Sequence, residues 1–179
     1  MMTLIETDRL IVSDFNLDDA AFIIKLVNSP GWLQYIGDRN IKSPEEARQY
    51  LENGPLKSYK QWGFGLYRVA LKNTNTAIGM CGLIKREVLD GIDIGFALLP
   101  AYEGQGYAYE AAKAVLDYAA KDLGMKRMLA ITMVDNAASI KLLQKLGLRF
   151  EKMIRLNDED LALLAMELGK ESHIVKEKE

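Results

Sequence analysis

The chain has 179 residues, a length typical of one compact domain and too short for two full enzymatic ones. With 49% hydrophobic, 27% charged and 8% aromatic residues, the composition is that of a soluble globular protein and excludes disordered, collagen-like and disulfide-scaffold classes. Lys and Arg number 23 and Asp and Glu 25, a formal net charge of -2, so no global positive field favours nucleic acid as a partner.

The cysteine and histidine content narrows the chemistry further. Cys81 has no second cysteine with which to pair, which suits a reducing, cytoplasmic setting. The only histidine, His173, lies in a polar stretch, so neither a Ser-His-Asp triad nor a histidine-rich zinc site is expected, and we predict no metal. The N-terminal segment carries charges, and no later segment is apolar enough to span a bilayer, so we expect no membrane partner.

We predict a single domain over residues 1–169 and a polar C-terminal tail over 170–179, because no linker or shift in composition divides the chain. A strand over 4–15 is followed by a helix over 17–27, with Asn16 as its N-cap. The breaker cluster 28–31 then leads into a predicted loop that contains Trp32 and Tyr35.

The next predicted helix starts at Ser43, with Pro44 at its first position and Glu46 completing a capping box, and it ends at Gly54-Pro55. Strands are expected over 62–71 and 77–83, joined by a turn at 73–75, and over 92–99, where Pro100 ends the last one.

Two glycines, Gly104 and Gly106, separate that last strand from a predicted helix over 107–121. The first N–H groups of a helix have no partner and the helix dipole is positive there, so such a turn can hold a pyrophosphate without lysines. A simple tight turn explains the two glycines equally well. A Rossmann site would need a third glycine where Tyr109 stands, and no P-loop sequence is present.

The second half of the chain strengthens the phosphate interpretation. A strand over 126–134 leads to Asn136 and to a helix that ends at Gly147, a C-terminal capping glycine. Two further strands are expected over 149–155 and 161–168. The apolarity of the last strand fits burial within one sheet and fits a homodimer interface equally well.

Four ordered motifs resemble the GNAT superfamily of acetyl-CoA-dependent N-acetyltransferases, and specifically its RimJ/RimL-like branch. They are Glu6-Thr7-Asp8-Arg9-Leu10, Asp93-Ile94-Gly95-Phe96, the run from Gly104 to Ala111, and Asn136-Ala137-Ala138-Ser139 followed by Lys145-Leu146-Gly147-Leu148. The resemblance covers nearly the whole chain. It implies an α/β fold of the α+β type: a mixed, largely antiparallel twisted sheet with helices on both faces and splayed central strands.

The resemblance also implies where acetyl-CoA binds. The pantetheine arm would lie between the strands over 92–99 and 126–134, and the Leu99 N–H would polarise the thioester carbonyl. The pyrophosphate would meet the glycine-rich turn. The implied cofactor-binding residues are Ala97, Leu98, Leu99, Gly104, Gln105, Gly106, Tyr107, Ala108 and Asn136.

Two catalytic residues follow from the same resemblance. Asp93 would take the proton of the amine through water, unless it is an ordinary charge at a strand edge. Ser139 would protonate the leaving thiolate, because Leu143 stands where many members carry a tyrosine; a serine that only bonds backbone is the alternative. Glu103 replaces the usual Gln or Arg at the start of the turn and could repel a phosphate.

The expected reaction is transfer of an acetyl group to a primary amine by direct attack in a ternary complex. The acceptor would be a protein N-terminus, a polyamine or a small amine, with Trp32, Tyr35 and Trp62 lining its pocket unless they are core residues. Cys81 is expected to be a core residue rather than an acyl carrier. The alternative is a non-catalytic acyl-CoA-binding or sensor protein of the same fold.

Overall fold

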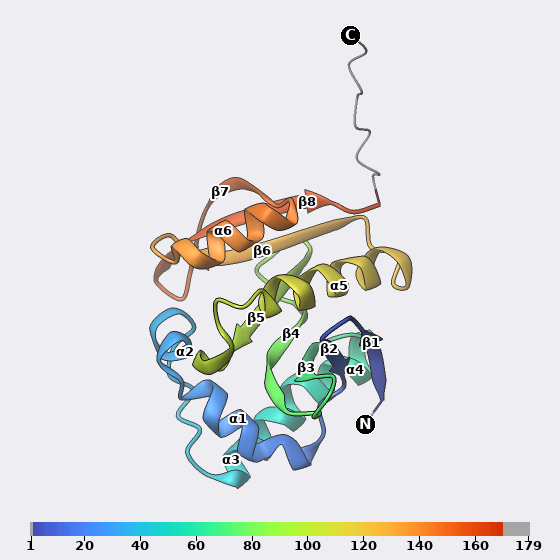
Figure 1. Cartoon of the computed structure of the whole chain (residues 1–179). Helices are drawn as coiled ribbons and strands as arrows, with labels where there is room; N and C mark the ends of the chain where they lie inside the picture. Colours follow the sequence, from blue (N-terminus) through green and yellow to red (C-terminus); the bar gives the residue numbers. More distant parts are fainter. Residues whose placement is uncertain (1, 170–179) are drawn as a thin grey trace.

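The computed structural model describes residues 2–169, and an eight-stranded sheet runs through them in the order β1-β2-β3-β4-β5-β6-β8-β7 (Figure 1). The predicted tail over 170–179 and His173 lie outside the described residues. The strands are β1 (Thr3–Glu6), β2 (Leu10–Ser13), β3 (Leu66–Leu71), β4 (Ala77–Lys85), β5 (Ile92–Leu98), β6 (Arg127–Met133), β7 (Arg149–Leu156) and β8 (Glu159–Glu167).

The junction between β5 and β6 differs from every other junction in this sheet. Neighbouring strands are antiparallel elsewhere, whereas β5 and β6 are parallel and are paired only at Asp93 and Leu129. On its other side, β5 pairs with β4 from Ile92 to Leu98. The two central strands therefore separate beyond Asp93, which confirms the predicted largely antiparallel sheet with splayed central strands.

Helices cover both faces of the sheet, as predicted (Figure 1). One buried cluster joins the sheet to α5 and α6, and a second joins it to α1, α2 and α3. The alanine-rich α5 buries Ala111, Ala112 and Ala119, whose small side chains let the helix lie close to the strands. The helices are α1 (Ala20–Val27), α2 (Pro30–Tyr35), α3 (Pro44–Leu51), α4 (Lys57–Trp62), α5 (Tyr107–Lys121) and α6 (Ala137–Leu146).

The prediction of a loop around Trp32 is wrong, because the segment forms α2. Pro30 occupies the first position of this helix, where a missing N–H costs nothing, so the proline starts a helix here instead of only ending one. Trp32 is only 4% exposed and packs into the second buried cluster. Burial of this side chain supplies a reason for helix formation that the local breaker signal does not contain.

The predicted helix end at Gly54-Pro55 is also wrong. A π-helical turn over Glu52–Leu56 carries both residues, and Lys57 N–H donates to the Glu52 carbonyl across this wider turn. The helical path continues through α4 to Gly63, whose φ of 75° caps it. Trp62, predicted to begin a strand, is therefore the last residue of α4, and β3 begins at Leu66.

The apolar C-terminal strand β8 lies between β6 and β7, so burial accounts for its sequence. Its residues from Leu161 to Leu164 are all buried. The edge strand β7 exposes Phe150 and Met153. A homodimer through these strands stays a prediction, as does a cytoplasmic location. Within residues 2–169 no helix has both the length and the apolarity that crossing a bilayer requires.

Candidate active site

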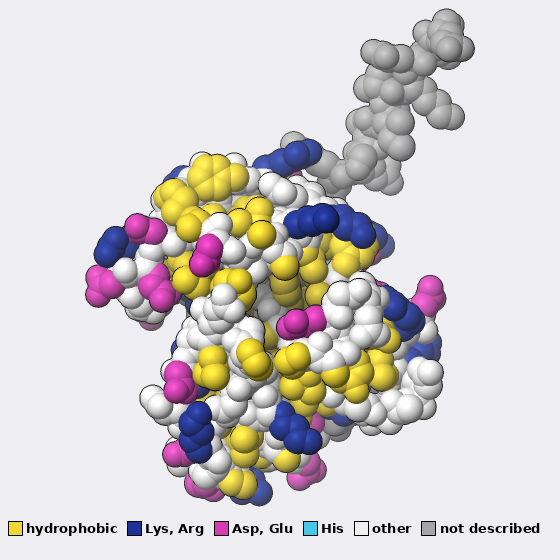
Figure 2. Space-filling view, turned by 60° about the vertical axis from the view of Figure 1, so that its left-hand side comes forward, with side chains coloured by type: hydrophobic (Ala, Val, Ile, Leu, Met, Phe, Trp, Pro, Cys, Tyr) yellow, Lys and Arg dark blue, Asp and Glu magenta, His cyan; other side chains and the backbone are white. Residues whose placement is uncertain are grey.

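A cleft of about 670 Å³ lies where β5 and β6 separate, and Figure 2 shows this side of the molecule hollowed between two lobes. Residues from α2 form one wall, the start of α5 and the first half of α6 form the other, and β5 lies along the floor. The cleft brings together most of the predicted site residues: Trp32, Tyr35, Asp93, Ala97, Leu98, Gly104, Gly106, Tyr107, Ala108, Asn136 and Ser139.

The glycine-rich turn has the backbone shape that an anion site needs. Gly104 and Gly106 have φ values of 72° and 83°, in the left-handed region that side chains other than glycine rarely adopt. Gly106 is the N-cap of α5, and the first intrahelical bond runs from Glu110 N–H to its carbonyl. The N–H groups of Tyr107, Ala108 and Tyr109 therefore have no partner in the helix. They supply donors at the positive end of the helix dipole.

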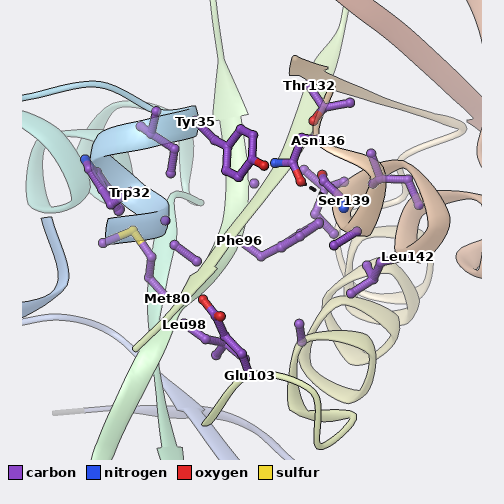
Figure 3. Close-up of a pocket in the computed structure, with 18 of the residues that line it drawn as sticks. Trp32, Tyr35, Met80, Phe96, Leu98, Glu103, Thr132, Asn136, Ser139 and Leu142 are labelled. Atoms are coloured by element: carbon purple, nitrogen blue, oxygen red, sulfur yellow. Dashed lines mark hydrogen bonds between the residues drawn. The ribbon is translucent and has the colours of Figure 1, made fainter. Parts of the chain in front are cut away.

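Glu103 does not point at these donors. Its side chain extends from the turn into the cleft (Figure 3), and its Oε1 lies 3.6 Å from where a Cβ on Gly31 would be. The carboxylate therefore faces the start of α2, on the opposite wall. It is exposed, and no residue in the described part of the chain bonds it. The predicted repulsion of a phosphate at this corner is weakened by that orientation.

The register of β5 indicates a different oxyanion donor from the predicted Leu99 N–H. Leu99 N–H donates to the Ile78 carbonyl at 2.8 Å, so it is already used in the antiparallel ladder with β4. Because successive residues of such a ladder turn their N–H groups to opposite sides, the register directs the Leu98 N–H away from β4, toward the opening to β6. The expectation for Leu99 is wrong for this reason: its amide faces the wrong strand.

Asp93 is a buried residue, not a solvated charge at a strand edge. Its side chain is 1% exposed, and Arg86 Nε donates to its two carboxylate oxygens at 3.0 and 3.2 Å. Burial raises the pKa of Asp93, and the neighbouring Arg86 offsets this only in part. The residue stands where β5 and β6 last touch, so its carboxyl lies at the closed end of the opening.

Asn136 and Ser139 stand together on the opposite side of the opening (Figure 3). The Asn136 side-chain oxygen caps α6 by accepting from Ser139 N–H at 3.2 Å. This leaves the Asn136 Nδ2 group turned toward the Tyr35 hydroxyl across the cleft (Figure 3). Within residues 2–169, no hydrogen bond engages the Ser139 hydroxyl. Leu143, one turn further on, is only 1% exposed and belongs to the core.

Of the three aromatic residues predicted to line the acceptor pocket, two lie at the cleft. Trp32 and Tyr35 reach it from α2. Trp62 does not: it is 42% exposed at the end of α4, and Lys85 Nζ lies 3.9 Å from the centre of its ring. The helical continuation past Pro55 carries Trp62 there. Gln105 also points elsewhere, its side-chain nitrogen donating to the Ala101 carbonyl at 2.9 Å.

Several lining residues escaped prediction because nothing in their local sequence marks them. Arg86 meets Asp93 through the pairing of β4 with β5, and Tyr50 and Met80 reach the cleft from α3 and β4. Phe96 and Thr132 line it from the two splayed strands. Of these residues, only Phe96 lies within one of the four motifs, Asp93-Ile94-Gly95-Phe96. The others depend on strand register and helix packing, which the spacing of residues along one segment does not encode.

Comparison with known proteins agrees with this geometry. Residues 9–149 match the family described as an acetyltransferase (GNAT) domain. The uncharacterised protein YkkB of Bacillus subtilis is 28% identical over 90% of this chain and 94% of its own length. The uncharacterised N-acetyltransferase YoaA of the same organism is 29% identical over 87% of this chain and 88% of its own.

Solved structures share the fold. RimL, described as a ribosomal L7/L12 alpha-N-protein acetyltransferase in complex with coenzyme A, superposes with a TM-score of 0.80 at 19% identity, covering 93% of this chain and 98% of that one. The family match covers most of the chain, and the splayed strands and the glycine-rich turn are consistent with it. This chain belongs to the GNAT family of N-acetyltransferases.

Proposed function

We propose that this chain transfers the acetyl group of acetyl-CoA to a primary amine by direct attack in a ternary complex. The observation that carries the proposal is the opening between β5 and β6, with free helical N–H groups on one wall and aromatic side chains on the other. An extended thioester and an amine could enter such an opening from opposite sides. Crystallised RimL, which has the same fold, is described as holding coenzyme A.

The residues at the cleft fit the chemistry of acetyl-CoA. The backbone N–H groups at the start of α5 would hold the pyrophosphate, and the two glycines allow it to approach the chain closely. The Asn136 amide and the Leu98 carbonyl would meet the pantetheine arm. By the same register, the N–H and C=O groups of Ala97 face β4 and not the opening. The cofactor supplies an acetyl thioester, whose carbonyl carbon the amine attacks while the bond from carbon to sulfur breaks.

The Leu98 N–H is the donor that we place on the thioester oxygen. The β4 ladder does not use this amide, and it faces the opening. A fixed backbone dipole there would stabilise the negative charge that develops on oxygen during attack. This role replaces the one expected of Leu99.

Asp93 is the base in this proposal. An ammonium has no lone pair, so its proton must leave before attack, and a buried carboxylate with a raised pKa accepts protons better than an exposed one. We route the proton through water, because Asp93 lies at the closed end of the opening. Arg86 holds both carboxylate oxygens and so fixes the carboxyl group in one orientation.

Ser139 is the acid. Its hydroxyl lines the cleft beside Asn136, and no other residue among 2–169 bonds it. The hydroxyl would give its proton to the departing sulfur and regain one from water. Cys81 is not an acyl carrier in this scheme: it is 1% exposed, and burial raises the pKa of its thiol. Direct transfer needs no such carrier.

The acceptor in this proposal is a cationic primary amine. Tyr35 gives the acceptor wall a half-buried aromatic ring, whereas Trp32 lines the cleft but is almost wholly buried. The Glu103 carboxylate extends into the cleft facing that wall. An ammonium suits both groups. The candidates remain a protein N-terminus, a polyamine or a small amine, and the description of RimL is a reason to include N-terminal peptides among those tested.

The test is thiol release from acetyl-CoA by the purified protein against a panel of N-terminal peptides, polyamines and small amines. The proposal predicts release that depends on one class of amine and saturates with its concentration. An equal molar amount of acetylated amine must appear, detected by mass spectrometry. Saturable binding of acetyl-CoA without release on any amine would favour a non-catalytic acyl-CoA-binding protein.

A further inference from the structure

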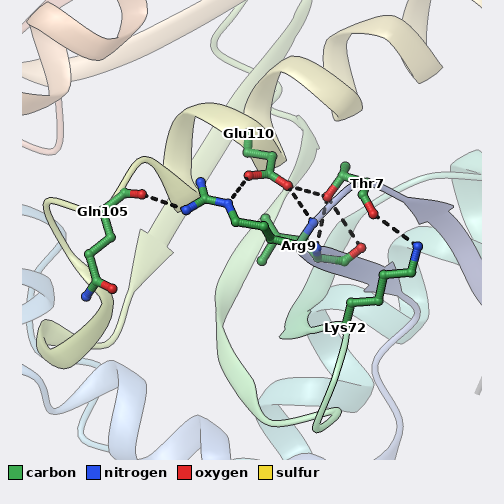
Figure 4. Close-up of polar contacts among 6 residues, drawn as sticks. Thr7, Arg9, Lys72, Gln105 and Glu110 are labelled. Carbon is green, nitrogen blue, oxygen red and sulfur yellow. Dashed lines mark hydrogen bonds and ion pairs between the residues drawn. The ribbon is translucent and has the colours of Figure 1, made fainter.

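A polar cluster lies behind the glycine-rich turn, outside the cleft (Figure 4). It joins the turn between β1 and β2 to the segment that comprises the glycine-rich turn and the first turn of α5, about a hundred residues away in sequence. Thr7 and Arg9 come from the first segment, and Gln105 and Glu110 from the second. None of the chemistry assigned above uses Thr7, Arg9 or Glu110.

The Glu110 carboxylate is fully engaged by the N-terminal segment. Its Oε1 accepts from Thr7 Oγ1 at 2.6 Å and from Arg9 N–H at 3.0 Å, and its Oε2 accepts from Arg9 Nε at 2.6 Å. Partial burial raises the pKa of Glu110, but the bonds from Thr7 and Arg9 outweigh it and lower the pKa overall. A negative charge in the first turn of α5 is thus neutralised on the side away from the cleft.

Arg9 also fixes the turn itself. Its Nη1 donates to the Gln105 carbonyl at 3.0 Å, and its guanidinium lies 4.3 Å from the centre of the Tyr107 ring. The peptide bond between Gln105 and Gly106 is trans, so its N–H points opposite to its carbonyl. Because Arg9 holds the Gln105 carbonyl on the outer side, the Gly106 N–H is directed to the inner side, where Gly106 lines the cleft.

The fit between Arg9 and the turn is close. A Cβ at Gly106 would lie 3.3 Å from Arg9 Nη2, a separation tighter than most real Cβ contacts. Glycine thus serves this position twice, by its positive φ and by the room that it leaves for the guanidinium. The arginine, the glycine and the direction of one peptide N–H form a single unit.

We propose that Arg9 is a positioning residue for the cofactor phosphates: held by Glu110, it locks the Gln105–Gly106 peptide so that its N–H faces the pyrophosphate. This inference rests on the proposed use of acetyl-CoA. It assigns Arg9 no contact with the thioester or with the amine. Loss of Arg9 should therefore weaken recognition of the phosphates and leave the chemical step intact.

The test compares two acetyl donors in Arg9→Ala and Arg9→Lys. Acetyl-CoA carries the pyrophosphate, whereas S-acetylpantetheine has the same thioester and arm without it. In Arg9→Ala, we expect the KM for acetyl-CoA and the calorimetric Kd for CoA to rise about tenfold with kcat nearly unchanged, the loss of one charge-assisted contact. The kcat/KM for S-acetylpantetheine should not change. Arg9→Lys keeps one donor and a charge, and it should recover part of the affinity.

Arg155→Ala is the matched control, because Arg155 forms an exposed ion pair with Asp160 at 3.0 Å on the β7–β8 hairpin. It should leave both donors unaffected. Equal losses with acetyl-CoA and S-acetylpantetheine would mean that Arg9 has only a structural role, and an unchanged KM for acetyl-CoA would also overturn the inference. If Arg9→Ala does not fold, Arg9→Lys gives the same comparison. A wild-type protein that fails to bind acetyl-CoA would instead refute the proposed function.

Discussion

Arg86 Nε lies 3.0 and 3.2 Å from the two carboxylate oxygens of Asp93, beside the single residue pair that joins β5 to β6. The ion pair thus stands where the sheet stops being continuous. Burial on this scale would be costly for an unpaired carboxylate, and the arginine reduces that cost. The Arg86–Asp93 ion pair also sets the protonation state of the carboxyl group at the closed end of the cleft, where we place the base.

Replacing Asp93 should change the pH dependence of the reaction. The folded pKa of Asp93 is raised, so the residue becomes an active base only as pH rises through a value above the ordinary 3.8. The wild-type kcat/KM should therefore fall on the acid side of that raised pKa. Asp93→Asn should lower kcat/KM by about a hundredfold and remove this acid limb. A mutant profile with the wild-type acid limb would exclude Asp93 as the base.

Ser139→Ala should reduce kcat by about tenfold while leaving the KM for acetyl-CoA nearly unchanged, because the hydroxyl would act only as sulfur departs. The cap of α6 depends on the Ser139 backbone and the Asn136 side chain, so stability should barely change. Steady-state kinetics and thermal unfolding measure the two effects. An unchanged kcat would leave the thiolate to be protonated by water.

Gly106→Trp should abolish acetyl-CoA binding. The substitution forces a bulky side chain onto a φ of 83° and against Arg9. Gly124→Trp is the matched control: its φ is 65°, but no atom lies within 4 Å of its Cβ position, and the residue is remote from the cleft. Both variants should lose some stability, and only Gly106→Trp should lose binding in calorimetry. Normal cofactor affinity in Gly106→Trp would contradict the placement of the phosphates.

Glu103→Gln should strengthen the binding of acetyl-CoA and weaken the binding of the amine. The variant removes a negative charge near the phosphate turn, and the charge faces the acceptor wall. We expect a Kd for CoA lower by about twofold to fivefold at low salt, with the effect fading as salt screens the charges. The KM for the amine should rise. Opposite movements of the two constants are the informative result, and a fall in both would refute the acceptor role of Glu103.

Because of Glu110, the free energy of unfolding should depend on pH in the acid range. Its folded pKa is lowered below 4.5, so its bonds to Thr7 and Arg9 contribute stability above that value and lose it as pH falls through the folded pKa. Glu110→Gln should therefore be less stable than the wild type near pH 7, and the difference should shrink below pH 4.5. Urea unfolding at several pH values measures this. If the difference in unfolding free energy between Glu110→Gln and the wild type did not change with pH, the carboxylate charge would contribute nothing to stability.

The sequence predicted the parts of the site that local chemistry determines. The bounds of α5, the two glycines before it and the capping glycine Gly147 all follow from capping and turn preferences within a few residues, and the structure has them where expected. The splayed strands came from the family resemblance. The match over residues 9–149 then confirmed the family.

The predictions that were wrong concern features that depend on contacts between residues distant in sequence. Gly54 and Pro55 lie within a π-helical turn, so the helix does not end there. Burial of Trp32 stabilises a helix directly after a breaker cluster. The direction of the Leu99 N–H depends on strand register, which a one-residue change reverses. The sequence marks Arg9 only as part of the motif Glu6-Thr7-Asp8-Arg9-Leu10. Its contacts became visible once the fold brought it to Glu110.

The most direct test of the central claim is isothermal titration of the purified chain with acetyl-CoA. We expect saturable binding with one site per chain, lost in Gly106→Trp and retained in Gly124→Trp. Heat that does not saturate, or equal binding in the two variants, would mean that the opening between β5 and β6 is not the acetyl-CoA site.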